Sequence, residues 1–224
     1  EFSELDRYIL HRLQSLNLAV YENLNIYNFH KLYKELLNFC TLDLSSFYFD
    51  IRKDTLYCDS IKSKKRENCI IILNIILECL QKWFAPIFVF TTEEINELIN
   101  KDGKSIHESL FVDIPGKWKN EILYKKWNQL YKIKQEANIA IEKKRSNKEI
   151  GSSLEAEIEI HTDVDSFNLM DGLDLSEYFI TSGAKKIKIL NNKDEKKIIV
   201  KKANGNKCPR CWKILKDKCE RCEK

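Results

Sequence analysis

The sequence predicts a mainly α-helical protein that ends in a small cysteine-rich module. Apolar residues recur at steps of three and four over the first two thirds of the chain, as on the buried face of a helix. Glycine and proline, which interrupt helices, number only 6 and 3. Two closely spaced cysteine pairs stand near the C-terminal end. We therefore expect an antiparallel helical bundle, then a small α+β subdomain and a four-cysteine zinc knuckle.

The expected bundle contains five helices, and the first two have clear start signals. Residues 4–22 form an amphipathic pattern, and Ser3 before them is a suitable N-cap. Asn28 is placed to cap a second helix, whose apolar stripe continues as far as Phe47. We expect residues 59–66 to form a polar connection after it.

The other three helices differ in length. A strongly apolar helix is expected over about residues 67–84, before a proline. Thr91 with Glu94 is a capping-box pattern and predicts the start of a short fourth helix. Residues 101–119 are expected to be irregular, and a long fifth helix is expected over about 121–145.

After the long helix the apolar period changes to two. Residues 155–161 alternate apolar and polar side chains, which predicts a strand with one wet face. A short helix is expected over 175–181, and two further short strands near 187–189 and 198–200 flank an Asn-Asn-Lys-Asp turn at 191–194.

These patterns predict three domains: a helical domain over 1–148, an α+β subdomain over 149–203 and a zinc module over 204–224. The charge is unevenly distributed along the chain. Residues 1–184 hold 23 Lys and Arg against 29 Asp and Glu, and residues 185–224 hold 15 against 5. The net charges are therefore −6 and +10, which favours a polyanionic partner at the C-terminal end; a solubilising tail is the alternative.

The cysteine pairs are the sharpest local signal. They are C-P-R-C and C-E-R-C, separated by seven residues, and their ligands are Cys208, Cys211, Cys219 and Cys222. Two such turns facing each other make a tetrahedral thiolate site for zinc, and four thiolates leave no open position for catalysis. Disulfides or an iron–sulfur cluster are the alternatives. Apolar packing is expected for the remaining thiols, Cys40, Cys58, Cys69 and Cys79.

An aromatic residue ringed by cations accompanies the cysteines. Trp212 follows Cys211 directly, and its basic neighbours are Arg210, Lys213, Lys218 and Arg221. Stacking on an aromatic ring combined with phosphate attraction is how single-stranded RNA is held. In the alternative interpretation, the cations offset the negative charge of a zinc–thiolate centre and the indole covers it. A polar helix end adds Arg52, Lys53 and Tyr57 as weaker RNA candidates.

Catalytic and membrane functions find no support in the sequence. The four histidines lie far apart, and no Gly-rich phosphate loop is present, so we assign no catalytic residue. With no signal peptide or membrane-spanning apolar run, the expected location is the cytoplasm. The chain begins with Glu1 and not Met, so we expect it to be part of a longer protein.

Several stretches of the chain form one ordered pattern: residues 27–40, 41–48, 50–58, 85–95, 105–107, 150–156, 207–213 and 219–222. Taken together, they resemble the C-terminal part of bacterial isoleucyl-tRNA synthetases, which are class I aminoacyl-tRNA synthetases. From its first stretch to its last, the resemblance spans nearly the whole chain. The seven residues between the two cysteine pairs are fewer than the family usually has, which indicates a trimmed zinc module with fewer RNA contacts.

The resemblance implies an anticodon-binding helical bundle and a zinc domain that grip the anticodon stem-loop of isoleucine tRNA. It strengthens the assignment of Trp212 and its basic neighbours to RNA contact. The parent enzyme would join isoleucine to its tRNA with ATP and Mg²⁺, but the catalytic and editing domains are missing here, so this chain alone is expected to be inactive. A monomer that binds neither DNA nor membrane is expected.

Two alternatives remain open from the sequence. The helical part is also compatible with a valyl- or leucyl-tRNA synthetase. The zinc module is also compatible with a non-enzymatic protein-interaction module that has no RNA affinity.

Overall fold

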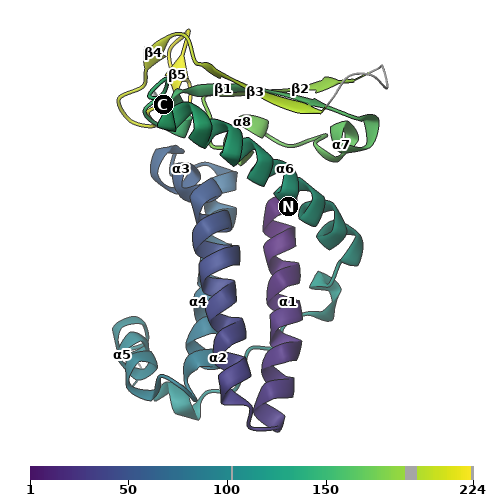
Figure 1. The fold of residues 1–224 in the computed structure, drawn as a ribbon. Coiled ribbons are helices and arrows are strands. Elements are labelled where there is room, and N and C mark those ends of the chain that lie inside the picture. The colour runs from purple at the N-terminus through teal and green to yellow at the C-terminus, as the bar shows by residue number, and fades with distance from the viewer. Residues whose placement is uncertain (102, 190–195, 223–224) are drawn as a thin grey trace. The chain divides into compact units, whose positions relative to one another are not determined.

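The computed structural model describes residues 1–101, 103–189 and 196–222, and its chain divides into two compact units (Figure 1). The first unit comprises Glu1–Leu56 and Ile61–Glu121, and the second comprises Tyr57–Ser60 and Ile122–Lys224. The expected turn at 191–194 lies outside the described residues. No helix among the described residues is long and apolar enough to cross a membrane.

The first two helices begin where their caps predict. α1 (Glu4–Asn25) follows Ser3, whose side chain accepts a hydrogen bond from the Asp6 N–H while the Asp6 side chain accepts one from the Ser3 N–H. α2 (Phe29–Asn38) follows Asn28, whose Oδ1 accepts from the Lys31 N–H at 3.1 Å. Both predicted starts are confirmed because capping depends on residues only three positions apart.

The predicted second helix is in fact three joined segments. α2 passes into a π-helix, η1 (Phe39–Phe49), and then into α3 (Asp50–Cys58). Inside η1 the Ser46 hydroxyl donates to the Thr41 carbonyl at 2.8 Å. The predicted stripe is confirmed at Leu44 and Phe47, which are buried, but Phe39 and Tyr48 are buried as well and Cys40 is only half-buried. The wider turn of a π-helix shifts which residues face inward, so a 3.6-residue period describes this segment only in part.

Two other sequence expectations are wrong in their details. α4 (Lys64–Phe84) begins inside the expected polar connection, because the Ser63 side chain caps it by accepting from the Arg66 N–H. α5 (Val89–Ile99) begins before the predicted Thr91 cap, directly after a tight turn that closes on the Phe84 carbonyl. The described residues of the stretch 101–119 are irregular as expected, apart from short 3₁₀ turns at η2 (Ile106–Glu108) and η3 (Gly116–Trp118).

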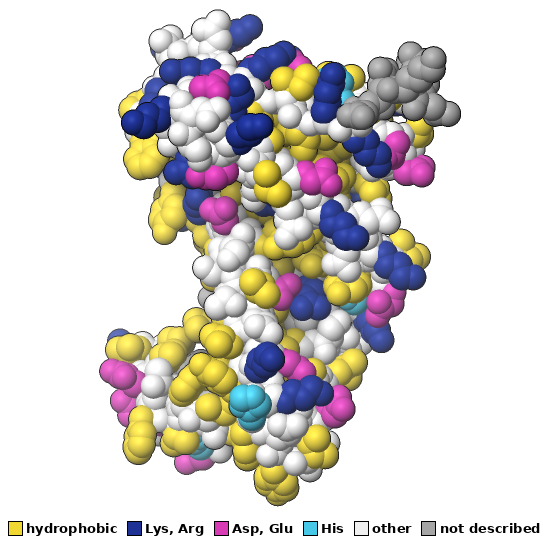
Figure 2. All heavy atoms as spheres, in the orientation of Figure 1, with side chains coloured by type: hydrophobic (Ala, Val, Ile, Leu, Met, Phe, Trp, Pro, Cys, Tyr) yellow, Lys and Arg dark blue, Asp and Glu magenta, His cyan; other side chains and the backbone are white. Residues whose placement is uncertain are grey.

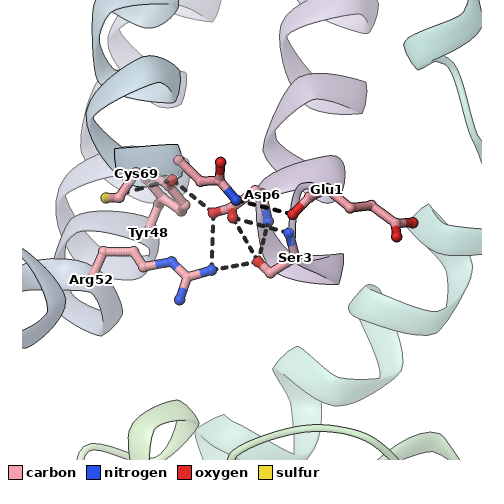
Figure 3. A network of polar contacts seen from close by, with 7 residues as sticks. Glu1, Ser3, Asp6, Tyr48, Arg52 and Cys69 are labelled. Atoms are coloured by element: carbon pink, nitrogen blue, oxygen red, sulfur yellow. Dashed lines mark hydrogen bonds and ion pairs between the residues drawn. The ribbon is translucent and has the colours of Figure 1, made fainter. Parts of the chain in front are cut away.

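A buried polar network ties the start of α1 to the η1–α3 segment (Figure 3). The Arg52 guanidinium donates to Asp6 Oδ1 at 2.9 Å, and the Tyr48 hydroxyl donates to the same oxygen at 2.9 Å. Both charged side chains are only 2% exposed. Burial, followed by the Asp6 charge, raises the pKa of Tyr48 far above its usual range, so this hydroxyl stays a donor.

A second polar contact fixes the irregular segment before the long helix. His11 on α1 is buried, and its Nδ1 accepts a hydrogen bond from the Asn120 N–H at 2.8 Å. Burial lowers the pKa of His11, which favours the neutral ring that this acceptor role requires. The histidine is therefore structural, as its isolated place in the sequence indicates.

The second unit is built on a three-stranded sheet. β1 (Ala156–Thr162) lies in the middle, parallel to β2 (Gly183–Lys188) and antiparallel to β3 (Lys197–Lys202). Its even-numbered side chains are buried and its odd-numbered ones are half-buried, which confirms the predicted alternation. Figure 1 shows α6 (Glu121–Ser146), α7 (Val164–Leu169) and α8 (Leu175–Tyr178) below this sheet.

The long helix groups with the sheet, so the compact units do not follow the predicted boundary at residue 148. The Trp127 ring on α6 packs edge-on against Tyr178 of α8, with ring centroids 5.6 Å apart. Lys134 also donates to the Tyr178 carbonyl. The short helix α7 was not predicted, because six residues are too few to show a helical period.

The buried ion pair yields a test of stability. Arg52→Met should lower the unfolding free energy by about 3–5 kcal/mol, because Asp6 is left as a buried charge without this partner. Lys53→Met, at the next position, is the matched control: its partner Asp50 is 2.6 Å away and both side chains are at least 40% exposed. The control should lose about 0–1 kcal/mol. Urea unfolding followed by circular dichroism measures both, and equal losses would contradict the assignment.

Candidate metal centre and nucleic-acid interface

The cysteine module is built on a short hairpin. β4 (Asn206–Lys207) pairs antiparallel with β5 (Ile214–Leu215). The turn between them is closed by the Cys208 N–H, which donates to the Lys213 carbonyl at 2.9 Å, and by the Trp212 N–H, which donates to the Cys208 carbonyl at 3.0 Å. The second cysteine pair forms a similar turn, in which the Cys222 N–H donates to the Cys219 carbonyl at 3.0 Å.

Gly205 at the start of the hairpin cannot carry a side chain. Its φ is +141°, and a Cβ there would lie 2.2 Å from the Leu215 carbonyl oxygen. A glycine is therefore needed for the two strands to come this close.

The two turns bring the four predicted ligand sulfurs together. The Sγ atoms of Cys208, Cys211, Cys219 and Cys222 all lie within 4.8 Å of one another. The Sγ atoms of Cys211 and Cys219 lie 3.7 Å apart. Within residues 1–101, 103–189 and 196–222, no other cluster of three or more metal-binding side chains is found. The predicted convergence of the two pairs is confirmed.

Negative charge on the four sulfurs needs a cation to balance it. A hydrogen bond from the Cys211 N–H, with another from the Arg210 N–H, lowers the pKa of Cys208 to about 7. Burial raises the pKa of Cys211 to about 11, and burial also raises that of Cys222. Four thiolates this close would repel one another, and a divalent cation at their centre removes the repulsion. All four donors are sulfur, which suits a closed tetrahedral metal site.

A fifth thiol packs against this cluster. Cys58, at the end of α3, is buried and forms one core cluster with Cys208, Cys211 and Cys219. It fulfils the expected apolar packing of the other cysteines, as do the fully buried Cys69 and Cys79. No local pattern could have placed Cys58 here, because about 150 residues separate it from the module.

Trp212 is held in a conformation unusual for its residue type. Its φ is +63°, in the left-handed region, and its side chain is 60% exposed. The hydrogen bonds of the cysteine turn impose this conformation, and such strain gathers at functional sites. The Lys207 ammonium lies 5.7 Å from the centroid of the indole. Trp212 therefore presents an exposed ring beside a positive charge.

The predicted cations do not all remain available at the surface. Arg210 and Lys218 are exposed, whereas Lys213 is half-buried and donates to the Ser176 hydroxyl at 3.3 Å. Arg221 is half-buried and paired with Asp59. Figure 2 shows Lys and Arg side chains gathered over the end of the second unit that carries the hairpin; the exposed ones in this stretch are Lys201, Lys202, Lys207, Arg210, Lys216 and Lys218.

The three RNA-contact candidates near the end of α3 differ in exposure and in the unit to which they belong. Tyr57 is 78% exposed and belongs to the second unit, where its carbonyl accepts from Arg210 at 3.0 Å. Lys53 is exposed but lies in the first unit. Arg52 is buried against Asp6, so its guanidinium is not at the surface and we leave it out of the interface.

Comparison with known proteins agrees with this architecture. A family model described as "Anticodon-binding domain of tRNA ligase" matches residues 6–160, which is more than half of the chain. The chain belongs to this family.

Relatives of this anticodon-binding domain include three bacterial proteins named isoleucine–tRNA ligase. The one from Pelagibacter ubique is 55% identical over 99% of the chain, that from Agrobacterium fabrum 38% over 97%, and that from Zymomonas mobilis 35% over 100%. The similarity therefore includes the cysteine module. The chain spans only 23–24% of the length of these relatives.

The hairpin geometry yields a test of how the module is organised. Gly205→Ala should raise the population of open hairpin roughly 5- to 150-fold, because a non-glycine residue strained in this way costs about 1–3 kcal/mol. The rate at which a disulfide reagent such as DTNB modifies the module thiols measures this opening. Gly116→Ala is the control, since a Cβ there meets nothing within 4 Å. Equal rates for the two variants would show that the hairpin does not depend on Gly205.

Proposed function

We propose that this chain is the tRNA-recognising part of an isoleucine–tRNA ligase and grips the anticodon stem-loop of isoleucine tRNA. The observation that supports this most directly is the 55% identity to an isoleucine–tRNA ligase over 99% of the chain, including the cysteine module. Relatives that differ in amino-acid specificity would share the helical part, so the identity across the module favours the isoleucine enzyme over its valine and leucine counterparts.

Binding far from the chemistry is the role that we propose for this domain in the full-length enzyme. The ligase joins isoleucine to its tRNA with ATP and Mg²⁺, and we place its catalytic and editing domains in the remaining three quarters of the protein. Contacts at the anticodon then supply binding energy that orients the acceptor end at the distant reacting centre. The enzyme acts in the cytoplasm as a monomer.

We propose zinc as the metal and assign it a structural role. Cys208, Cys211, Cys219 and Cys222 would be its four ligands, and a site closed by four thiolates has no position for water or substrate. Zinc at this site supplies folding free energy to a module of about twenty residues, which is too small to form a stable hydrophobic core alone.

The RNA surface that we propose lies on the second unit. Trp212 offers an exposed ring for an unpaired base, and Tyr57 offers another. Arg210, Lys213, Lys218 and Arg221 supply positive charge near the module, and Lys53 is a separate candidate on the first unit. Stacking is sequence-tolerant, so discrimination among anticodons requires hydrogen bonds to base edges in addition.

Metal analysis tests the zinc assignment. The purified chain should contain one zinc ion per molecule by inductively coupled plasma mass spectrometry, and Cys219→Ser should lose most of it, because three ligands bind more weakly than four. Cys79→Ser, which alters a buried thiol of α4 in the first unit, is the control and should keep its zinc. Iron with visible absorbance would indicate a cluster, and a mass lowered by two hydrogen atoms per cysteine pair would indicate disulfides.

RNA binding tests the function itself. The chain should bind a fluorescent anticodon stem-loop of isoleucine tRNA at about 0.15 M salt and prefer it to a loop with a replaced anticodon. Trp212→Ala should weaken binding about 5- to 150-fold, since stacking on one side chain contributes roughly 1–3 kcal/mol. Phe90→Ala, which removes an exposed aromatic ring from the first unit, should change little.

The other outcomes of this titration identify the alternatives. Equal and salt-sensitive binding to both loops would indicate that the basic residues of 185–224 attract phosphate without regard to sequence. Absence of binding to either loop would favour the protein-interaction module.

A further inference from the structure

The two cysteine turns share a feature that the metal site does not explain. Each turn has an arginine at its third position, in Cys208-Pro-Arg210-Cys211 and in Cys219-Glu-Arg221-Cys222. Both arginines reach the same short segment at the end of α3. Arg210 Nη2 donates to the Tyr57 carbonyl at 3.0 Å, and Arg221 Nε donates to Asp59 Oδ1.

Cys58 lies between these two contacts and completes the attachment. Cys58 is 5% exposed and lies in one buried core cluster with Cys208, Cys211 and Cys219. Three consecutive residues of one segment are thus held by the module, through a carbonyl, a buried thiol and a carboxylate.

Loss of the Arg221–Asp59 contact is expected to cost free energy. The side chains of Arg221 and Asp59 are 24% and 13% exposed, so the pair is partly shielded from water. Hydrogen bonds that involve charged groups contribute more than neutral ones, and a partly buried carboxylate that loses its partner is left poorly solvated.

We infer that the segment Tyr57–Ser60 is a metal-controlled element, which the four-cysteine module clasps through the arginines of its two turns. The positions of Arg210 and Arg221 depend on the turns that carry them, because each arginine directly precedes a ligand cysteine. When the ligands are held together, the arginines are placed to grip Tyr57 and Asp59. When the ligands separate, this geometry is lost and the segment is released.

The consequence concerns the exposed ring of Tyr57. The Tyr57 carbonyl accepts a hydrogen bond from Arg210 of the module, while Tyr57 itself is 78% exposed. The clasp therefore orients the ring without covering it. Arg210 and Arg221 are therefore positioning residues for the segment. This inference rests on the proposed metal site, and it does not depend on RNA binding.

Hydrogen exchange followed by mass spectrometry tests the clasp in the whole 224-residue chain. Stripping the metal with EDTA should speed exchange of the amides in Tyr57–Ser60 about tenfold or more, whereas peptides from α6 should change little. Asp59→Ala and Arg221→Ala should produce the same local increase in untreated protein. The matched control is Glu149→Ala, which removes the 2.6 Å pair with Lys144 elsewhere in the second unit and should leave the segment protected.

Two results would overturn the inference. One is unchanged exchange of the segment after EDTA while the peptides of the module open. The other is unchanged exchange in Asp59→Ala, a variant that keeps all four ligands and so remains informative even if EDTA unfolds the whole second unit.

A binding measurement with the anticodon stem-loop adds an independent readout. Tyr57→Ala should weaken binding in the intact protein and should have no further effect when combined with Asp59→Ala. If exchange in Tyr57–Ser60 increases as expected but no RNA binds, the clasp is supported and the proposed function is wrong. If RNA binds but exchange in the segment does not change, only the clasp is wrong.

Discussion

Four cysteine sulfurs that lie within 4.8 Å of one another impose the main constraint on the second unit. Sulfur anions at this separation repel unless a cation lies between them, so the module is stable only with its charge balanced. The local geometry follows from this convergence. The two hairpin strands come close together at Gly205, and the first turn places Trp212 at positive φ. The arginine at the third position of each turn bonds outside the sulfur cluster, to the Tyr57 carbonyl or to Asp59. A module of this size has few apolar side chains, and Leu215 and Cys58 supply part of its small core.

In the first unit, a buried ion pair links helical segments that are distant in the sequence. The start of α1 meets the η1–α3 segment at a buried Arg52–Asp6 pair, and Asp6 also accepts a hydrogen bond from the Tyr48 hydroxyl and belongs to the capping box of α1. Such a pair contributes little net stability compared with apolar packing of equal volume, but it tolerates few alternative arrangements. It links the capping box of one helix to the junction of η1 with α3. A single carboxylate therefore helps to define where two helical segments begin.

The distribution of arginines changes how the basic end of the chain is understood. Counted along the sequence, Arg52, Arg210 and Arg221 all look like phosphate ligands. In the structure, Arg52 pairs with a buried carboxylate, Arg221 pairs with Asp59, and Arg210 holds a main-chain carbonyl. The charge that remains most open to solvent comes mainly from lysines, which suits a sequence-independent attraction for phosphate. In the proposed RNA surface, stacking of unpaired bases then falls to exposed rings, and Trp212 and Tyr57 are the two that the second unit presents near the module.

Features that depend on residues close together in the chain could be predicted from the sequence alone. Ser3 and Asn28 cap helices through bonds three residues long, β1 alternates because its faces differ in burial, and each C-x-x-C turn closes on itself. Tertiary structure decided the rest. The burial of Arg52, the grouping of α6 with the sheet and the approach of Cys58 to the module all join residues tens to about 150 positions apart. A one-dimensional pattern records which side chains are apolar or charged, but it does not record which distant partner removes them from water.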